Sequence, residues 1–299
     1  MSPISYPGGK GKIGAILLPY IPPFVEYREP FFGGGSIYFA IKQRAPSSCQ
    51  FWVNDACPFV STFWRVIRDQ PAALLKRLKT DYHYLQKERH NMTDFNYTIQ
   101  HHTTHKEHVK AFFHQNKKQP PKTLTEIEIA ANFYWINRMS FSSVAAAGFS
   151  YTRFNRCGPQ QFTKLPHVSP LLQNTRITTE DYLPLLETEG ENVFLYLDPP
   201  YENNPDAQLY GRNGKLHAEF HHLRFAEALR KCKHQFILTY NDSPTIREYY
   251  KWAHIQTLNI QYDMTITSEK VDELLISNFP LRPQLQWNIH QSSLLHFVT

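Results

Sequence analysis

The chain has 299 residues, with 32 Lys and Arg against 26 Asp and Glu, and a formal net charge of +6. Its 41% of hydrophobic residues suffices for the core of one large or two modest domains, which excludes a wholly disordered chain. No apolar run approaches the roughly 18 residues of a membrane span, and the first residues lack the pattern of a signal peptide. Four scattered cysteines without a C-x-x-C pair are typical of a reducing compartment. We therefore expect a cytoplasmic protein with no membrane partner.

The positive charge is concentrated in one internal segment. Residues 60–124 contain twelve Lys and Arg but five Asp and Glu, an excess of +7 that leaves about −1 for the remainder of the chain. Aromatic residues and seven histidines are interleaved with these charges. This composition is typical of a surface that binds phosphates and stacks on bases. A solvated helical face has the same composition, so both interpretations remain open at this point.

The first part of the chain has the pattern of a strand, a glycine turn, a helix and a second strand. Residues 24–28 and 50–55 are strand-like, and residues 37–42 between them have helical character. The glycine-rich turn lies at residues 29–36, directly after the first strand. A unit of this kind is the start of a parallel sheet.

The middle of the chain is predicted to be mainly helical. Residues 59–92 have leucines at helical spacing after Pro71, which suits a first helical position. A polar, histidine-rich segment follows, as a loop or a helix, until two prolines interrupt it. A capping-box pattern at residues 125–128 opens a helix to about residue 139. Residues 140–170 have the composition of a loop.

The strand pattern returns in the last part of the chain. Residues 192–197 form an apolar run typical of a strand that is buried on both faces. The other elements predicted here are a strand at 176–179, a helix at 217–231, a strand at 235–240, and a terminal antiparallel pair at 255–260 and 273–278. The chain is therefore predicted to form an α/β sheet that is interrupted by a basic, mainly helical insert.

The glycine-rich turn is the first segment with a chemical interpretation. Such a turn lets a ligand approach the backbone closely, and the next helix supplies N–H groups. Asp55 lies at the tip of the next strand, about 20 residues after Gly35, where an acidic side chain binds ribose hydroxyls. The pair predicts a cofactor that contains adenosine. The alternative is a tight strand–helix turn in which Asp55 only caps the backbone.

The segment D-P-P-Y at residues 198–201 is the second segment with a chemical interpretation. It follows the buried strand, and ligands of open α/β sheets bind beyond the carboxyl ends of strands. Asp198 is a hydrogen-bond acceptor, the two prolines stiffen the backbone and expose carbonyls, and Tyr201 offers a flat ring. These groups suit a planar base with an exocyclic amino group. The alternative is a strand exit that is stiffened by proline and capped by aspartate.

Several segments together resemble one protein family. They occur in the order found in the Dam-like, D12 class of DNA adenine-N6 methyltransferases, the α group of amino-methyltransferases. The segments are 6–10 (Y-P-G-G-K), 29–36 (E-P-F-F-G-G-G-S), 54–55 (N-D), 137–142 (N-R-M-S-F-S), 198–201 (D-P-P-Y) and 270–275 (K-V-D-E-L-L). The resemblance extends over most of the chain, and ordered motifs are more specific than any one of them.

The resemblance implies a fold and a domain organisation. The fold is the α/β, Rossmann-like fold of S-adenosylmethionine-dependent methyltransferases, with a mostly parallel sheet that ends in an antiparallel strand pair. Residues 1–59 and 160–299 would form a discontinuous catalytic domain, and residues 60–159 a mainly helical insert for target recognition. S-adenosyl-L-methionine is the implied cofactor. Methyl transfer from its sulfonium needs no metal, so no metal site is predicted.

The family's functional residues are expected at the matching positions. The carboxylate of Asp198 and the Pro199 carbonyl would accept hydrogen bonds from the N6 amino group of a flipped-out adenine, and Tyr201 would stack on that base. The catalytic residues implied are Asp198, Pro199, Pro200 and Tyr201. The cofactor-binding residues implied are Tyr6, Lys10, Phe31, Gly33, Gly35, Asp55, Asp181 and Asp198.

Double-stranded DNA is the partner that the resemblance implies. After Arg138 the sequence departs from the family, because an alanine-rich stretch stands where the Dam-like pattern has a basic hairpin. No recognition sequence is therefore carried over. The enzyme would act with a cognate restriction endonuclease, as a separate protein, or as a solitary modification enzyme. The predicted DNA-binding residues are Lys76, Arg77, Arg89, Arg138, Arg153 and Arg156.

Two other functions and one other site stay open. A methyltransferase for another amino group, RNA adenine or cytosine N4, is the first alternative, although D-P-P-Y favours adenine. The second is a catalytically silent nucleic-acid-binding relative, which would have a damaged tetrad or glycine turn, and both are intact. The histidines at 101, 102, 105 and 108 have a spacing that suits a metal ion, or a polar face beside DNA.

Overall fold

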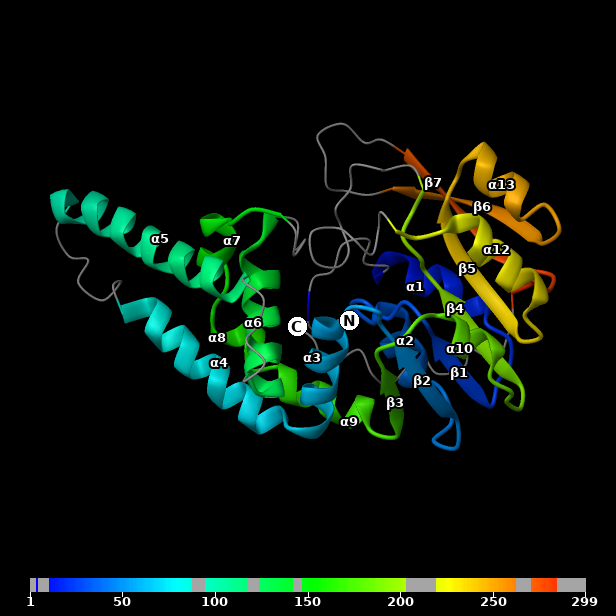
Figure 1. Cartoon of the computed structure of the whole chain (residues 1–299), viewed down its shortest axis with the longest axis horizontal. Helices are drawn as coiled ribbons and strands as arrows, with labels where there is room; N and C mark the ends of the chain where they lie inside the picture. The colour runs from blue at the N-terminus through cyan, green and yellow to red at the C-terminus, as the bar shows by residue number, and fades with distance from the viewer. Residues whose placement is uncertain are drawn as a thin grey trace.

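The computed structural model has two parts, an α/β sheet and a lobe of helices beside it (Figure 1). Within the described residues, seven strands form one sheet in the order β3-β2-β1-β4-β5-β7-β6. The structure describes residue 4 and residues 11–87, 95–117, 124–141, 147–202, 219–261 and 270–283.

Strands β1 to β5 are parallel, and β7 is antiparallel to both β5 and β6. The mostly parallel sheet and its terminal antiparallel pair are as predicted from the sequence. The strands are β1 (Glu26–Glu29), β2 (Gln50–Asn54), β3 (Thr175–Thr178), β4 (Val193–Leu197), β5 (Gln235–Asn241), β6 (His254–Gln261) and β7 (Lys270–Ser277).

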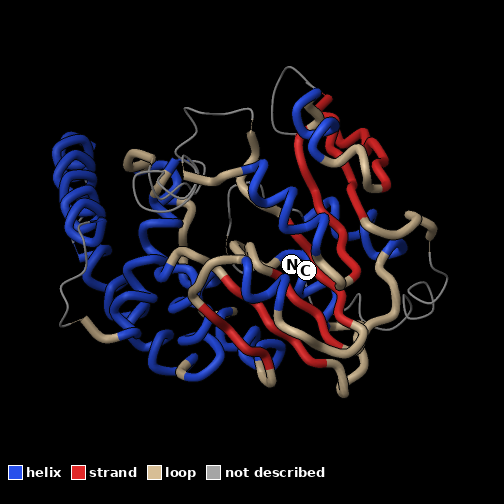
Figure 2. The backbone as a smooth tube through the Cα atoms, turned by 45° about the vertical axis from the view of Figure 1, so that its right-hand side comes forward, coloured by secondary structure: helices blue, strands red, loops and turns tan. Residues whose placement is uncertain are grey.

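Helices cover both faces of the sheet (Figure 2). Strand β4 shows why, because its side chains alternate between two apolar clusters: Phe194 and Tyr196 pack on one side, Leu195 and Leu197 on the other. On the first side lie α1 (Gly11–Leu17), the 3-10 helix η1 (Leu18–Tyr20), α2 (Ser36–Lys42) and α3 (Pro58–Asp69); on the second lie α10 (Leu183–Glu187), α12 (His222–Lys231) and α13 (Pro244–Tyr249).

The helical lobe is built around α6 (Glu126–Met139). Thr125 caps this helix in the predicted capping box, since its side chain accepts from the backbone of Glu128 while the Glu128 carboxylate accepts from the backbone of Thr125. The other helices described in the lobe are α4 (Pro71–Gln86), α5 (Phe95–Lys117), α7 (Tyr151–Asn155), α8 (Pro159–Phe162), η4 (Leu165–Val168) and α9 (Ser169–Leu172), of which α9 packs against α3.

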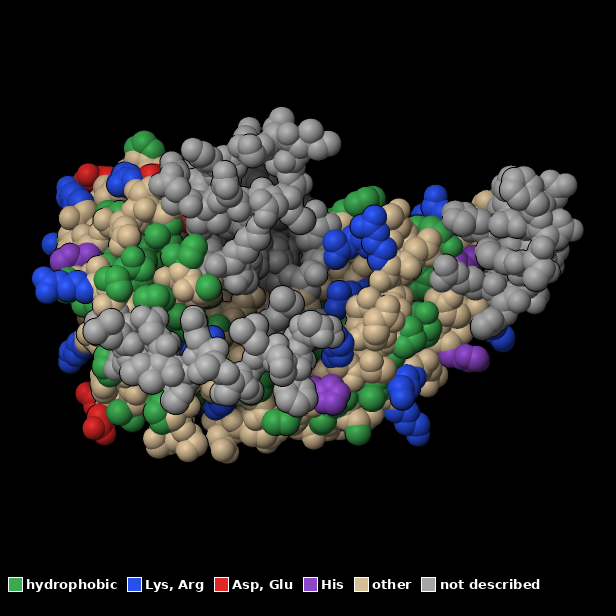
Figure 3. Space-filling view, turned by 180° about the vertical axis from the view of Figure 1, so that it is seen from behind, with side chains coloured by type: hydrophobic (Ala, Val, Ile, Leu, Met, Phe, Trp, Pro, Cys, Tyr) green, Lys and Arg blue, Asp and Glu red, His purple; other side chains and the backbone are tan. Residues whose placement is uncertain are grey.

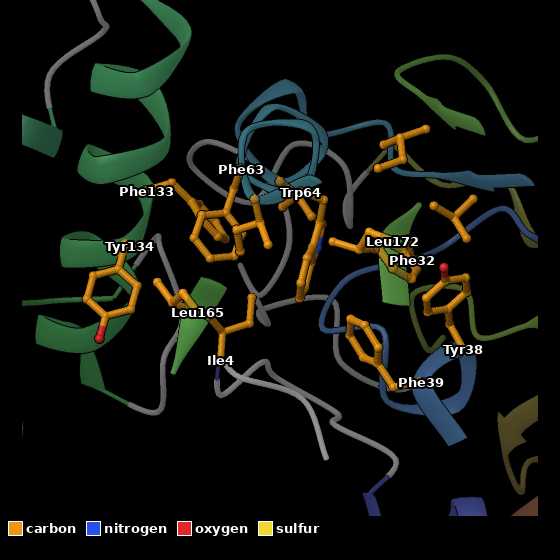
Figure 4. Close-up of a cluster of buried hydrophobic side chains, with 14 of the residues drawn as sticks. Ile4, Phe32, Tyr38, Phe39, Phe63, Trp64, Phe133, Tyr134, Leu165 and Leu172 are labelled. Carbon is orange, nitrogen blue, oxygen red and sulfur yellow. The ribbon is translucent and has the colours of Figure 1, made fainter. Parts of the chain in front are cut away.

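Helix α3 joins the two parts into one core. Trp64 packs against Phe32 and Phe39 beside the sheet, while Phe63 packs against Phe133 and Tyr134 of α6 (Figure 4). A single apolar cluster therefore runs from the sheet into the lobe. The predicted domain boundary near residue 60 falls inside this helix, and the division into two domains remains a prediction.

Three predicted elements need correction. The helix expected over 59–92 is broken at Gln70, where Pro71 starts α4 as a new helix and removes a backbone donor. The stretch 140–170 contains short helices rather than only loop, each of at most five residues, too short to show a periodic pattern. In the stretch 217–231 the described helix begins at His222.

Among the described residues, no helix combines the length and the apolar character that crossing a membrane requires. The longest helix, α5, has 23 residues and a largely polar sequence.

Candidate active site

A cleft of about 270 Å³ opens at the carboxyl ends of the central strands. Ligands of open α/β sheets bind at this edge, where the strand order changes direction. The side chains that line the cleft come from segments far apart in the sequence. They are residues 29–37, residues 54–56, residues 180–182, Tyr196, Asp198, Pro200, residues 219–221 and Arg224.

The glycine-rich turn forms one wall of the cleft. Gly33 and Gly35 have φ values of 46° and 67°, in the left-handed region that side chains rarely adopt. A Cβ atom on Gly35 would also lie 2.8 Å from the ring of Phe32. The indole of Trp64 donates a 2.9 Å hydrogen bond to the Gly33 carbonyl. The turn is thus held from α3 as well as by its own conformation.

Asp55 connects the end of β2 to this turn. Its Oδ2 accepts from the Gly33 N–H at 2.9 Å, and its Oδ1 accepts from the Cys57 N–H at 2.8 Å. Burial raises the pKa of Asp55 to about 6, against the opposing effect of these two N–H groups. Asp55 also lines the cleft. It therefore caps the backbone, as the alternative interpretation had it, and also lies in the lining of the cleft.

Asn54, directly before Asp55, ties two loops of the cleft to β2. Its Nδ2 donates to the Pro30 carbonyl at 3.1 Å and to the Glu180 carbonyl at 3.0 Å, and its Oδ1 accepts from the Glu180 N–H. This residue orients both the glycine-rich turn and the segment 180–182. Sequence reasoning placed Asn54 only as a neighbour of the ribose-binding acid and missed this role.

Asp198 lies at the exit of β4 and is oriented from β5. Thr239 donates a hydrogen bond of 3.0 Å to Asp198 Oδ1, and the Tyr196 hydroxyl lies 3.0 Å from the Thr239 hydroxyl. A relay of hydroxyls thus fixes one oxygen of the carboxylate. Pro199 is buried behind it, and Pro200 lines the cleft.

Tyr201 is held from two neighbouring strands. Its hydroxyl donates to Oε1 of Glu273 on β7 at 2.8 Å. Its ring stacks on Tyr240 of β5 with a centroid separation of 5.6 Å and an interplanar angle of 30°. Burial, followed by the negative charges of Asp198 and Glu273, raises the pKa of Tyr201 well above its usual value. The hydroxyl therefore remains a proton donor.

Phe31 belongs to an aromatic wall of the cleft, and it is the one residue of this wall that was predicted from the sequence. Its ring lies 5.8 Å from Tyr182, 5.7 Å from Phe220 and 5.5 Å from Phe225. Phe31, Tyr182 and Phe220 also line the cleft. The residues come from three segments, so only the fold brings them together. A flat ring system fits beside such a wall.

The cleft has a strongly acidic lining. Among its described lining residues, six carboxyl groups face one arginine, Arg224. Burial raises the pKa of Glu29, and the nearby charge of Asp198 raises it further, while a 2.6 Å hydrogen bond from Tyr27 opposes both. This lining favours a cationic ligand and disfavours phosphates. The six are Glu29, Asp55, Glu180, Asp181, Asp198 and Glu219.

Asp181 was predicted to bind the cofactor. It is exposed at the edge of the cleft, and its Oδ1 accepts from the backbone N–H of Leu183 at the start of α10. Tyr6 and Lys10, which were predicted to hold the cofactor as well, lie outside the described residues. Glu29, Glu180 and Glu219 were not among the predicted site residues. Glu29 ends β1 and entered only as the first residue of the glycine-rich motif, whereas Glu180 and Glu219 lie outside helices and strands, where an acid has no distinctive spacing.

The predicted DNA-binding residues differ in their surroundings. Lys76 is exposed on α4. Arg77, the next residue, is ion-paired with Asp81 at 2.8 Å and with Glu128 at 3.2 Å. Its guanidinium thus joins α4 to α6 within the lobe. Arg89 lies outside the described residues.

Three other arginines predicted to bind DNA lie close together. The positive charges of Arg138 and Arg156, after partial burial, lower the pKa of Arg153. Arg156 is exposed, and Arg138 lies over the ring of Tyr134 at 5.4 Å. Seen from behind, Lys and Arg side chains follow the inner edge of the helical lobe, which faces the sheet domain (Figure 3). This concentration of positive charge is what a polyanion requires.

Of the four histidines considered as a metal site or a polar face, the side chains of His101 and His102 lie outside the described part of the structure, and His105 does not belong to a polar face. His105 is fully buried, with one ring nitrogen against the Tyr151 hydroxyl and the other 2.8 Å from the Leu85 carbonyl. It packs α5 against α4 and α7. Within the part of the chain that the structure describes, no group of three or more His, Cys, Asp or Glu is placed to hold a metal ion.

The sheet order and the D-P-P-Y segment at the strand ends define an amino-methyltransferase of the Rossmann-like class. Comparison with known proteins gives the family. The model of the D12 class N6 adenine-specific DNA methyltransferases matches residues 6–264, and the chain belongs to this family. It is also similar to the Type II methyltransferase M.MjaIII of Methanocaldococcus jannaschii, with 22% identity over 214 residues, 67% of this chain and 68% of that protein.

Proposed function

We propose that the protein transfers a methyl group from S-adenosyl-L-methionine to N6 of an adenine that is flipped out of duplex DNA. The observation that carries this proposal is the position of Asp198. Its carboxylate lies at the edge of an acidic cleft, with one oxygen fixed by Thr239 and with the Tyr201 ring three residues further along the chain. An amino acceptor and a cationic donor would meet there.

The cleft fits the proposed cofactor by its chemistry. S-adenosyl-L-methionine supplies an electrophilic methyl group on a sulfonium, and it carries a second positive charge on its amino group. The excess of carboxylates favours both charges. Asp55, which lines the cleft, would accept hydrogen bonds from ribose hydroxyls, and the adenine ring would lie beside the wall formed by Phe31, Tyr182 and Phe220.

The residues of the tetrad would act on the target base. Asp198 and the Pro199 carbonyl would accept from the N6 amino group, draw its lone pair out of conjugation with the ring, and stabilise the positive charge that develops on N6. Holding that nitrogen in line with the methyl group is a positioning contribution. Tyr201 would stack on the base, since N6 is inaccessible within a duplex.

The helical lobe would bind the DNA. The proximity of Arg138, Arg153 and Arg156, and the basic inner edge of the lobe, support a phosphate-binding surface beside the cleft. Arg77 is less suited to this task, because its two ion pairs already use its charge within the lobe.

We further propose a role in restriction–modification, with a cognate endonuclease as a separate protein. The support for this role is the similarity to a Type II methyltransferase. A solitary modification enzyme is the alternative. Expression in cells with and without a candidate neighbouring nuclease gene would separate them: protection of the host DNA supports the first role.

The test of the activity is product identification. DNA from cells that express the protein is digested to nucleosides, and the methylated nucleoside is identified by mass and retention, while modification-sensitive sequencing locates the site. The proposal predicts N6-methyladenine at a short recurrent sequence. N4-methylcytosine, methylated RNA with unmodified DNA, or no methylation would contradict it.

A further inference from the structure

One buried side chain near the tetrad has no partner for either of its polar atoms. Asn241 is the last residue of β5 and is 9% exposed. Among the residues that the structure describes, neither its Oδ1 nor its Nδ2 makes a hydrogen bond. Buried amides are almost always hydrogen-bonded, because an unsatisfied one lowers stability. Asn241 therefore calls for a functional explanation.

The strand pattern places Asn241 beside the catalytic residues. Side chains alternate along β5: Leu238 and Tyr240 belong to one apolar cluster, whereas Ile237 belongs to the other. Asn241 consequently shares its face with Thr239, about 7 Å further along the strand toward the open edge. Thr239 is the residue that donates to Asp198.

The neighbouring strand β7 brings to the same place the residue that holds Tyr201, the last member of the tetrad. Asn241 pairs in register with Glu273 of β7, so the two side chains lie on the same face of the sheet. Glu273 is the acceptor of the Tyr201 hydroxyl. Asn241 is thus flanked by the residue that orients Asp198 and by the residue that holds Tyr201.

A primary amide offers a donor and an acceptor side by side. In adenine, the exocyclic amino group stands next to ring nitrogens that are acceptors, and asparagine reads this combination by a bidentate pair. The Asp198 carboxylate and the Pro199 carbonyl would accept hydrogen bonds from the two hydrogens of the amino group. The ring nitrogen beside them, N1 or N7, has no donor assigned to it by the tetrad.

We propose that Asn241 binds the edge of the target adenine, with Nδ2 donating to the ring nitrogen next to the amino group. The proposal rests on the function proposed above and names a base-binding residue for it. Among the described residues, the side chain of Asn241 makes no hydrogen bond. Its amide is therefore kept for the substrate, at the expense of stability.

The experiment combines variants of Asn241 with altered substrates. Asn241→Leu keeps the size of the side chain and removes both polar atoms, and Asn241→Asp replaces the donor with a second carboxylate oxygen beside Glu273. Single-turnover methylation is measured on duplexes with adenine, 1-deazaadenine or 7-deazaadenine at the target position. We expect the methylation rate of the wild type to fall by about tenfold to hundredfold on one of the two analogues. The nitrogen missing from that analogue is then the one that Asn241 binds. On adenine, the methylation rates of both variants should be lower than that of the wild type by a similar factor. On the analogue that slows the wild type, the variants should be no slower than they are on adenine.

Thermal unfolding separates this role from a structural one. Asn241→Leu should leave Tm unchanged or raise it, because an unsatisfied buried amide is replaced by an apolar group. Asn278→Ala is the matched control, because Asn278 accepts a hydrogen bond from the Phe236 N–H and donates one to the His234 carbonyl, remote from the cleft. This variant should have a lower Tm and an unchanged methylation rate.

The outcomes that overturn the proposal are distinct from failure of the function itself. Wild-type rates for Asn241→Leu, or the same loss on both analogues in wild type and variant, would overturn the role of Asn241 while N6-methyladenine is still made. A wild type that yields no N6-methyladenine overturns the proposed function and this inference with it.

Discussion

The hydroxyl of Tyr201 donates a 2.8 Å hydrogen bond to Oε1 of Glu273, and this bond links the segment after β4 to the antiparallel strand β7. Glu273 is 2% exposed, so the bond is shielded from water. Together with the stack on Tyr240, it fixes the orientation of the Tyr201 ring. The antiparallel end of the sheet therefore supports the D-P-P-Y segment as well as extending the sheet.

The ring and the hydroxyl of Tyr201 should contribute separately to the methylation rate. Tyr201→Ala removes the stacking surface and should lower the methylation rate by about tenfold to hundredfold, since stacking on a base contributes roughly 1–3 kcal/mol. Tyr201→Phe keeps the ring and loses only the bond to Glu273, so its rate should fall by a smaller factor. Steady-state methylation of a defined duplex measures both. Equal losses in the two variants would show that the hydroxyl, rather than the ring, matters.

The carboxyl of Asp55 predicts a pH dependence of stability. Because burial raises its pKa from 3.8 to about 6, the folded state favours the neutral form, and the associated stability is lost as the pH rises through 6. The free energy of unfolding of the wild type, relative to Asp55→Asn, should decrease by about 2 kcal/mol between pH 4 and pH 7. Urea unfolding of both proteins across this range gives the difference. A constant difference would contradict the raised pKa.

Cofactor binding should change with pH in the opposite direction. Ionised Asp55 is the better acceptor for ribose hydroxyls, so the affinity for S-adenosyl-L-methionine should increase from pH 5 to pH 7 with a midpoint near the pKa of about 6. Calorimetric titration measures it. Asp55→Asn should bind more weakly and without this midpoint, and a midpoint that persists in the variant would assign it to another group.

The conformation of Gly35 makes the turn sensitive to a single methyl group. Gly35→Ala places a Cβ at a φ of 67° and 2.8 Å from Phe32, which should lower stability by about 2 kcal/mol or more and weaken cofactor binding. Gly14→Ala in α1 is the control, because its Cβ would meet nothing closer than 3.6 Å and alanine favours a helix. The control should be neutral or stabilising in thermal unfolding. A Gly35→Ala protein as stable as the control would contradict the strain.

The arginines of the lobe should fall into two groups when DNA binding is measured against salt. Arg156→Ala should weaken binding and reduce the slope of log K against log salt by about 0.9, the value for one phosphate contact. Arg77→Met should leave this slope unchanged and lower stability, because its ion pairs with Asp81 and Glu128 lie within the lobe. Equal slopes for wild type and Arg156→Ala would exclude Arg156 from phosphate binding.

Much of the sheet could be predicted from the sequence because its strands carry local signals. The run at β4 is apolar throughout since it is buried on both faces, and the capping box before α6 is a pattern of four residues. The short helices between 151 and 172 could not be predicted, because helices of four or five residues are stabilised by packing and have no period of their own.

The candidate site divides in the same way. The glycine turn and the D-P-P-Y segment are contiguous motifs, so their residues could be named in advance. The wall around Phe31, the support of Tyr201 by Glu273 and the unpartnered amide of Asn241 join residues from distant segments. Arg77 shows the converse: its charge is visible in the sequence, but its two carboxylate partners are not.

In the proposed mechanism, Asp198 accepts a hydrogen bond from the amino group that is methylated. Asp198→Ala should reduce N6-methyladenine formation by about a hundredfold to a thousandfold or more, since it removes an acceptor for the charge that develops on N6, while binding of S-adenosyl-L-methionine is at least partly retained. Asp242→Ala is the matched control, a carboxylate after the next strand that is paired with Arg247 at 2.7 Å, and it should keep its activity. The most direct measurement is the yield of N6-methyladenine nucleoside from one defined duplex incubated with each protein. Loss in Asp198→Ala alone is the predicted result, and wild-type yield from Asp198→Ala would contradict the account.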